Sequence, residues 1–158
     1  VLITVLGFLS FKKDELDVNC KGSISIPKFS LPILANGSGD FTNNDFNTIS
    51  LVSFVSDICG PCSIELSNIA DIVGKYDMKD FSVYIFVVDA GDSILKVIND
   101  KGLVCPVIQC DSLLLKDLLV KSIPTRILFY NNMEVKRLEG TPSYLESDFR
   151  KSIDHYLK

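Results

Sequence analysis

The chain has 158 residues, of which 47% are hydrophobic and 23% charged, and its formal net charge is −4. This length and composition predict one compact domain and exclude a disordered or collagen-like chain. Sixteen Lys and Arg against twenty Asp and Glu leave no basic face for phosphates, so we expect no nucleic-acid binding. The single histidine, His155, is too little for a His-rich metal centre or for most catalytic triads, and we expect no metal.

The N-terminal segment bears on cellular compartment. Residues 1–11 form an apolar run that ends at a charged stretch. The run is too short to span a bilayer, which takes about 20 residues, but it matches the apolar part of a secretory signal. We therefore expect residues 1–22 to be a signal or anchor remnant with a linker, and residues 23–158 to be the folded domain. An N-terminal strand or a buried helical turn is the alternative for the run.

Beyond residue 23, strand and helix patterns alternate. Residues 23–34 alternate apolar and polar side chains around two prolines, and the turn signal at 36–39 follows, which suggests edge strands and an N-terminal β-hairpin. The later patterns predict, in chain order, a strand at 51–55, a helix around 66–74, a strand at 82–88, helices at 93–99 and 113–120, strands at 125–130 and 134–139 around a turn at 131–133, and a last helix.

In the last helix, Ser143 and Glu146 have capping-box spacing. One helical face would carry Leu145, Phe149, Ile153 and Tyr156. The complete pattern predicts an α/β fold whose central mixed sheet is flanked by helices, with parallel strands in the centre and antiparallel strands at the edge.

The segment Cys59-Gly60-Pro61-Cys62 lies between the first buried strand and the first core helix. A helix start directs unpaired N–H groups and a positive dipole end at its surroundings, which can lower the pKa of a cysteine below its free value of about 8.5. We therefore predict Cys59 as the nucleophile and Cys62 as the thiol that resolves a mixed disulfide. Pro61 suits the first helical turn because its missing N–H would be unpaired there.

Two other interpretations of this motif compete with redox chemistry. Half of a zinc site would need a second ligand pair, and Cys105 and Cys110 have neither zinc-knuckle spacing nor a nearby histidine. A static structural disulfide is the second alternative. The preceding strand, the following helix and the Gly-Pro dipeptide favour the redox role.

With Ile123-Pro124-Thr125 some sixty residues later, the motif resembles the thioredoxin superfamily. More narrowly, the segment 26–31 (IPKFSL) and the pattern Cys59-x-x-Cys62-x-x-Glu65 resemble the TlpA/ResA-type extracytoplasmic thiol-disulfide oxidoreductases. The likeness runs from about residue 24 to the C-terminus. It implies a thioredoxin-like fold whose only redox group is the Cys59–Cys62 disulfide, with no cofactor.

The resemblance also assigns supporting residues. Pro124 matches a cis-proline facing the active site, where Ile123 offers its backbone to a substrate strand; only proline makes a cis bond cheap enough to hold there. Glu65 matches an acidic residue that lies near the active site, and an exposed first-turn glutamate is the alternative. At position 53, where cytosolic thioredoxins carry a buried Asp, this chain has Ser53, which leaves Glu65 or water as proton acceptor.

The remaining cysteines stay open at this point. Cys105 and Cys110 could form a second disulfide or remain buried free thiols. Cys20, in the polar linker, is expected to be a free thiol or a point of dimerisation.

We expect an oxidoreductase that reduces disulfides of exported proteins outside the cytoplasm, taking electrons from a membrane thiol-disulfide donor and acting as a monomer. The resemblance implies apocytochrome c as one substrate. The alternatives are a disulfide oxidase or isomerase on the same fold and a Cu(I)-handling assembly factor, although Met78 and Met133 lie far from the motif in sequence.

Overall fold

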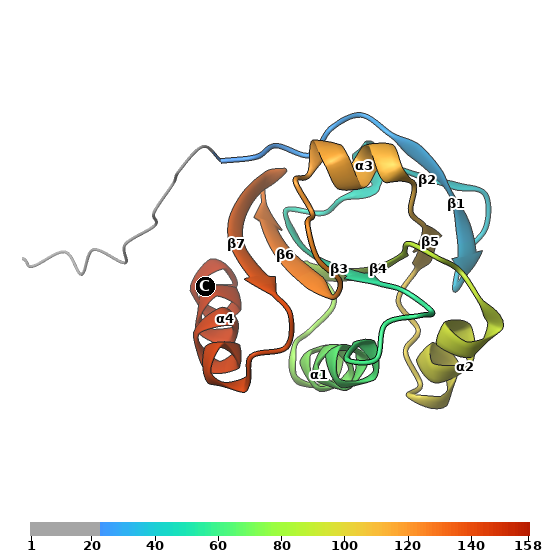
Figure 1. Cartoon of the computed structure of the whole chain (residues 1–158). Coiled ribbons are helices and arrows are strands. Elements are labelled where there is room, and N and C mark those ends of the chain that lie inside the picture. The colour runs from blue at the N-terminus through green and yellow to red at the C-terminus, as the bar shows by residue number, and fades with distance from the viewer. Residues whose placement is uncertain (1–22) are drawn as a thin grey trace, which may run out of the picture.

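The computed structural model describes residues 23–158, which form one seven-stranded sheet with helices on both faces (Figure 1). The expected signal or anchor segment, the linker and Cys20 lie outside the described residues. In chain order the elements are β1 (Ser30–Ala35), β2 (Asp40–Thr42), the 3-10 helix η1 (Asn43–Asp45), β3 (Ile49–Val55), α1 (Cys62–Lys75), β4 (Phe81–Val87), α2 (Asp92–Asp100), β5 (Val107–Gln109), α3 (Ser112–Asp117), β6 (Thr125–Tyr130), β7 (Met133–Glu139) and α4 (Ser143–Tyr156).

The sheet order is β2-β1-β5-β4-β3-β6-β7, which is the mixed sheet that the sequence predicts. The parallel pairs are β3 with β4 and β4 with β5, whereas β6 and β7 extend the sheet with antiparallel pairs. All seven residues of β3 are buried because β3 has a neighbour on each side and helices over both faces. Its register pairs Phe54 with Thr125, so β6 begins beside the carboxyl end of β3.

Two apolar cores lie on opposite faces of the sheet. α1, α2 and α4 cover one face (Figure 1). The other face is covered by α3 and by the segments that come before β1 and after β2. The first core takes in Leu66 and Ile69 of α1 and Phe149 of α4, and the second contains Phe86 and Leu114. Within residues 23–158, no helix has the length and apolar character that crossing a membrane requires.

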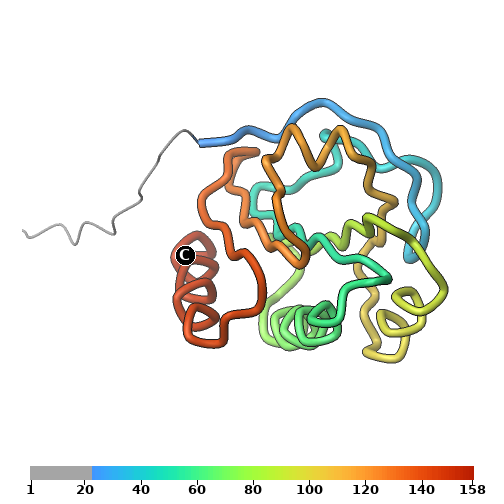
Figure 2. Tube along the Cα trace, viewed as in Figure 1, coloured from blue at the N-terminus to red at the C-terminus, as the bar shows by residue number. Residues whose placement is uncertain are grey.

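The two hairpins turn at the positions that the sequence indicates. β1 and β2 form the expected N-terminal hairpin, with register pairs from Ser30–Thr42 to Pro32–Asp40. β6 and β7 are joined by Asn131 and Asn132, both at positive φ, so the turn has two residues and Met133 already belongs to β7. The first described residues run beside this turn, where the Ile26 N–H donates to the Asn132 carbonyl (Figure 2).

The predicted capping box at the last helix is wrong. Pro142 stands at the N-cap of α4 and no side chain caps the helix. Glu146 instead accepts hydrogen bonds from Arg126 and Arg150, because two buried or half-buried guanidinium groups compete for its carboxylate. Leu145, expected on the buried face, is 37% exposed, whereas Phe149 and Ile153 are fully buried.

Candidate active site

The cysteine pair lies where β3 ends and α1 begins. Cys59 and Cys62 form a disulfide with their Cα atoms 5.4 Å apart. Cys62 is the first residue of α1, and its N–H donates to the Cys59 carbonyl at 3.2 Å. Cys62 has no exposed surface, Cys59 is partly exposed, and Ile58 before it is 85% exposed. An attacking group from solvent therefore meets the Cys59 side of the disulfide first.

The Ile123–Pro124 pair lies at the same end of the sheet. The bond between these residues is cis, the conformation that the resemblance implies. Because Thr125 begins β6 opposite Phe54, Pro124 is placed beside the carboxyl end of β3, from which the cysteine loop emerges. The side chains of Ile123 and Cys59 pack against the same core cluster that contains Cys62. Gly60 and Pro61, the two central residues of the motif, are exposed.

Glu65 is fully buried, one turn beyond Cys62 in α1. Its Oε1 accepts hydrogen bonds from Ser53 Oγ at 2.7 Å and from Arg126 Nε at 2.9 Å, and its Oε2 accepts from Arg126 Nη2 at 2.7 Å. The alternative of an exposed first-turn glutamate is thus wrong. The carboxylate lies against the strand position where cytosolic thioredoxins carry an aspartate, and it comes here from the helix.

Arg126, which lies beside Glu65, is not among the residues that the sequence singles out. It faces Ser53 across the β3–β6 pair and is 1% exposed. Burial by itself lowers the pKa of Arg126, but the hydrogen bonds and charge of Glu65 and Glu146 outweigh burial and raise the pKa above its usual value. The signal in the sequence is that Arg126 is the single charged residue of the strand expected at 125–130, since a buried guanidinium needs a buried carboxylate.

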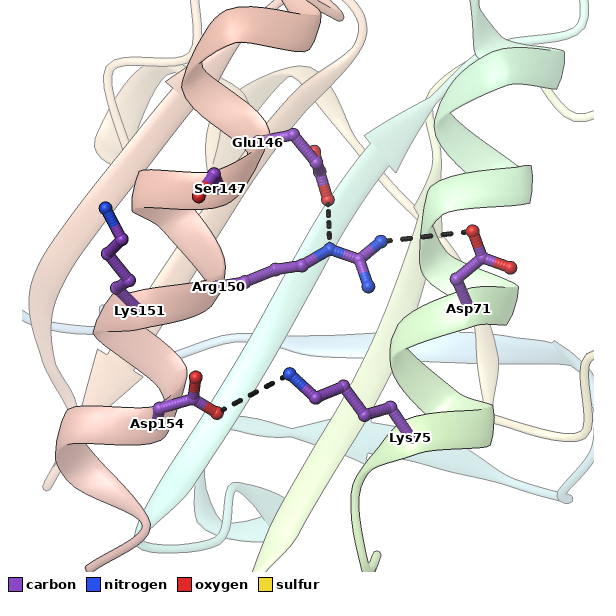
Figure 3. Close-up of a pocket in the computed structure, with 7 residues that line it drawn as sticks. All are labelled: Asp71, Lys75, Glu146, Ser147, Arg150, Lys151 and Asp154. Atoms are coloured by element: carbon purple, nitrogen blue, oxygen red, sulfur yellow. Dashed lines mark hydrogen bonds and ion pairs between the residues drawn. The ribbon is translucent and has the colours of Figure 1, made fainter.

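The buried pair continues to a surface groove between α1 and α4 (Figure 3). Arg126 Nη1 donates to both oxygens of Glu146 at 3.0 Å, and Glu146 Oε1 also accepts from Arg150 Nε at 3.0 Å. Arg150 then reaches Asp71 of α1 at 4.0 Å. The charges of this groove satisfy one another, so the chain of ion pairs ties the start of β6 to both helices.

The possible second disulfide is not formed. Cys105 and Cys110 are buried free thiols. Cys105 belongs to the core under α1 and α2, and Cys110 to the core under α3, because the short strand β5 lies between them and their side chains enter opposite faces of the sheet. Burial raises the pKa of Cys105 to about 11 and that of Cys110 to about 12. Both thiols are therefore unreactive near neutral pH.

Among residues 23–158, no group of three or more His, Cys, Asp or Glu side chains is placed to hold a metal ion. The chemically competent group at this end of the sheet is the Cys59–Cys62 pair. It can pass two electrons by opening and closing its disulfide.

No family model matches the sequence, and no curated protein matches it. Solved structures do match the fold. A candidate thiol:disulfide interchange protein DsbE from Chlorobium tepidum is 21% identical, with a TM-score of 0.74, over 86% of this chain and 97% of that one. A candidate thioredoxin from Neisseria meningitidis is 24% identical, with a TM-score of 0.70, over 85% and 90% of the two chains. A thioredoxin family thiol:disulfide interchange protein, also from Chlorobium tepidum, is 16% identical, with a TM-score of 0.69, over 86% and 97%. The chain therefore has a thioredoxin-like fold.

Proposed function

On the premise of that thioredoxin-like fold, we propose that this chain is a thiol-disulfide oxidoreductase that works through Cys59 and Cys62. The observation that carries the proposal is the asymmetry of the disulfide at the start of α1: one sulfur belongs to a partly exposed residue and the other to a fully buried one. A static cross-link needs no such asymmetry. A redox pair needs one cysteine that substrates can reach. The second cysteine needs access only to the sulfur of the first.

In the reducing direction, the Cys59 thiolate attacks one sulfur of a substrate disulfide. A Cys59–substrate disulfide forms, and the other substrate sulfur leaves as a thiolate that takes a proton from water. Cys62 then gives its proton to water and attacks the Cys59 sulfur as a thiolate. This step re-forms the Cys59–Cys62 disulfide and releases the second substrate sulfur as a thiolate, which also takes a proton from water. Two electrons have passed to the substrate, and a partner dithiol protein must return them. The cycle uses no cofactor.

We infer the reducing direction from the Gly60-Pro61 dipeptide, which is that of thioredoxin. The resemblance to extracytoplasmic oxidoreductases supports exported proteins as substrates, apocytochrome c among them, and a membrane thiol-disulfide protein as electron donor. The same resemblance and the apolar run at 1–11 support a place outside the cytoplasm. We also propose that the protein acts as a monomer.

Insulin reduction by dithiothreitol tests the activity. The wild type should accelerate it, and Cys59→Ser should abolish the acceleration. Cys105→Ala is the matched control, because it removes a buried free thiol and should keep the activity. A Cys59→Ser variant as active as the wild type would refute the proposal.

Two further measurements test direction and substrate. A reduction potential near that of thioredoxin, about −270 mV, supports a reductase, and one near −120 mV would show an oxidase. Cys62→Ala should trap mixed disulfides on Cys59 in the native organism. Exported thiol proteins among the trapped partners support the proposed compartment, and mainly cytosolic partners would contradict it.

A further inference from the structure

The loop that carries Cys59 is attached to the segment between β4 and α2. Val88 N–H donates to the Val55 carbonyl at 2.8 Å, and Asp57 N–H donates to the Asp89 carbonyl at 3.1 Å. Ser56 Oγ lies 3.4 Å from Asp89 Oδ2. These contacts extend the β3–β4 pairing beyond the strands, almost to the cysteine.

The Asp57 side chain makes a further contact that differs in kind. Its Oδ1 accepts a hydrogen bond from the Ile94 N–H, in the first turn of α2, at 2.7 Å. The residue at the N-cap of α2 is Gly91, which has no side chain to cap the helix. Asp57 therefore takes the capping role from a different part of the chain, two residues before Cys59.

The contact between Asp57 and α2 needs a residue without a side chain at position 91. Its φ is −128°, which any residue adopts, so backbone conformation does not require glycine there. A Cβ atom at this position would lie 2.4 Å from Asp57 Oδ2 and 2.5 Å from Asp57 Cγ. Any other residue would thus displace the carboxylate from α2. The glycine and the aspartate make one fitted contact.

We propose that Asp57 is a positioning residue for Cys59: its carboxylate, bound to the N-terminus of α2 in the space that Gly91 leaves, holds the loop that presents Cys59 at the start of α1. This inference rests on the proposed redox function. Cys59 lies within the same turn, where its N–H donates to the Ser56 carbonyl at 3.3 Å. Freeing the preceding residues lets the Cys59 sulfur leave the helix start that stabilises its thiolate.

Gly91→Ala is the most informative variant because it moves the carboxylate and keeps its charge. The displaced group is the end of a flexible side chain, so the protein should still fold. We expect the pH midpoint of Cys59 alkylation by iodoacetamide, measured on the reduced Cys62→Ala form, to rise by about half a unit, and the rate at pH 7 to fall roughly threefold. Asp57→Asn keeps an oxygen for the Ile94 N–H and should not raise the midpoint.

Two comparisons separate positioning from helix stability. Gly91→Ala should have no further effect in an Asp57→Ala background, because the carboxylate that the methyl group meets is then absent. Gly74→Ala is the matched glycine control, since its Cβ would meet no atom within 4 Å, and it should leave the alkylation profile unchanged.

The outcomes distinguish this inference from the proposed function. If Cys59 of the parent protein alkylates no faster than glutathione at pH 7, the redox function and this inference fall together. If Cys59 is activated but Gly91→Ala lowers only the melting temperature, Asp57 is a helix cap alone and the inference is wrong. Full additivity of Gly91→Ala with Asp57→Ala would also refute it.

Discussion

Replacing Arg126 by methionine should be among the most destabilising single changes in the domain. Glu65 accepts three hydrogen bonds, two of them from Arg126, and both residues have about 1% of their side-chain surface exposed. The variant leaves Glu65 buried with Ser53 as its one remaining partner. Removing one member of a buried ion pair costs about 3–5 kcal/mol, since the other charge stays in a low-dielectric interior. Against a total stability of about 5–15 kcal/mol, the variant should still fold.

Urea unfolding of the oxidised protein measures this loss. With an m-value of about 2 kcal/mol/M, a loss of about 4 kcal/mol moves the midpoint down by about 2 M. Lys96→Ala is the matched control, because the Lys96–Asp100 pair has side chains 74% and 55% exposed. An exposed pair contributes about 0–1 kcal/mol, so its midpoint should move little.

A double variant separates the unpaired charge from lost packing. Glu65→Gln/Arg126→Met removes both charges, keeps an acceptor for Ser53 and should recover most of the loss. If Arg126→Met costs no more than Lys96→Ala, or if the double variant is as unstable as Arg126→Met, the assignment of the cost to a stranded Glu65 charge is refuted.

Three other changes follow from the structure. Ser53→Asp should destabilise the protein by several kcal/mol in urea unfolding, because a second carboxylate would replace the hydroxyl that donates to Glu65, and Ser53→Ala should cost only about 1–3 kcal/mol. In the folded protein the pKa values of Cys105 and Cys110 lie above the unfolded value of about 9. The contribution of the two thiols to folding stability is therefore complete below pH 9 and is lost as the pH rises towards 11. Replacing both cysteines by Ala should flatten the fall of the urea midpoint between pH 9 and 11. Asn132→Ala should cost about 1 kcal/mol and Asn132→Gly should not, as thermal melting can show, because the residue has φ of 64°.

The parts of the fold that the sequence predicts depend on neighbours along the chain. The largely apolar run at 51–55, interrupted only by Ser53, identifies β3, and the helical spacing of Leu66 and Ile69 identifies α1 between two such runs. The cysteine motif belongs to this class too, since its meaning comes from the strand before it and the helix after it. Boundaries then differ by up to four residues, as at the start of α1, because hydrogen bonding rather than apolarity decides where an element ends.

The interpretations that the structure does not bear out have a different origin. The predicted capping box at Ser143 and the open alternative of a Cys105–Cys110 disulfide both assumed that residues close in sequence would pair. Glu146 pairs instead with Arg126, twenty residues earlier. Pro106 and the three residues of β5 separate Cys105 from Cys110, and the two thiols enter opposite cores. The spacing of residues along a short segment does not predict a contact with a residue that strand pairing brings close from elsewhere in the chain.

The buried ion pair one helical turn beyond Cys62 has the same non-local origin. Ser53 and Arg126 meet because β3 and β6 pair in antiparallel register, and Glu65 reaches them from the helix that begins at Cys62. The carboxylate near position 53 is thus supplied by α1, and a guanidinium accompanies it. Transfer of the thioredoxin pattern at position 53 alone would place an acid beside an acid. Ser53, Glu65 and Arg126 depend on one another. The meaning of a serine at position 53 is therefore judged together with the residues that α1 and β6 place beside it.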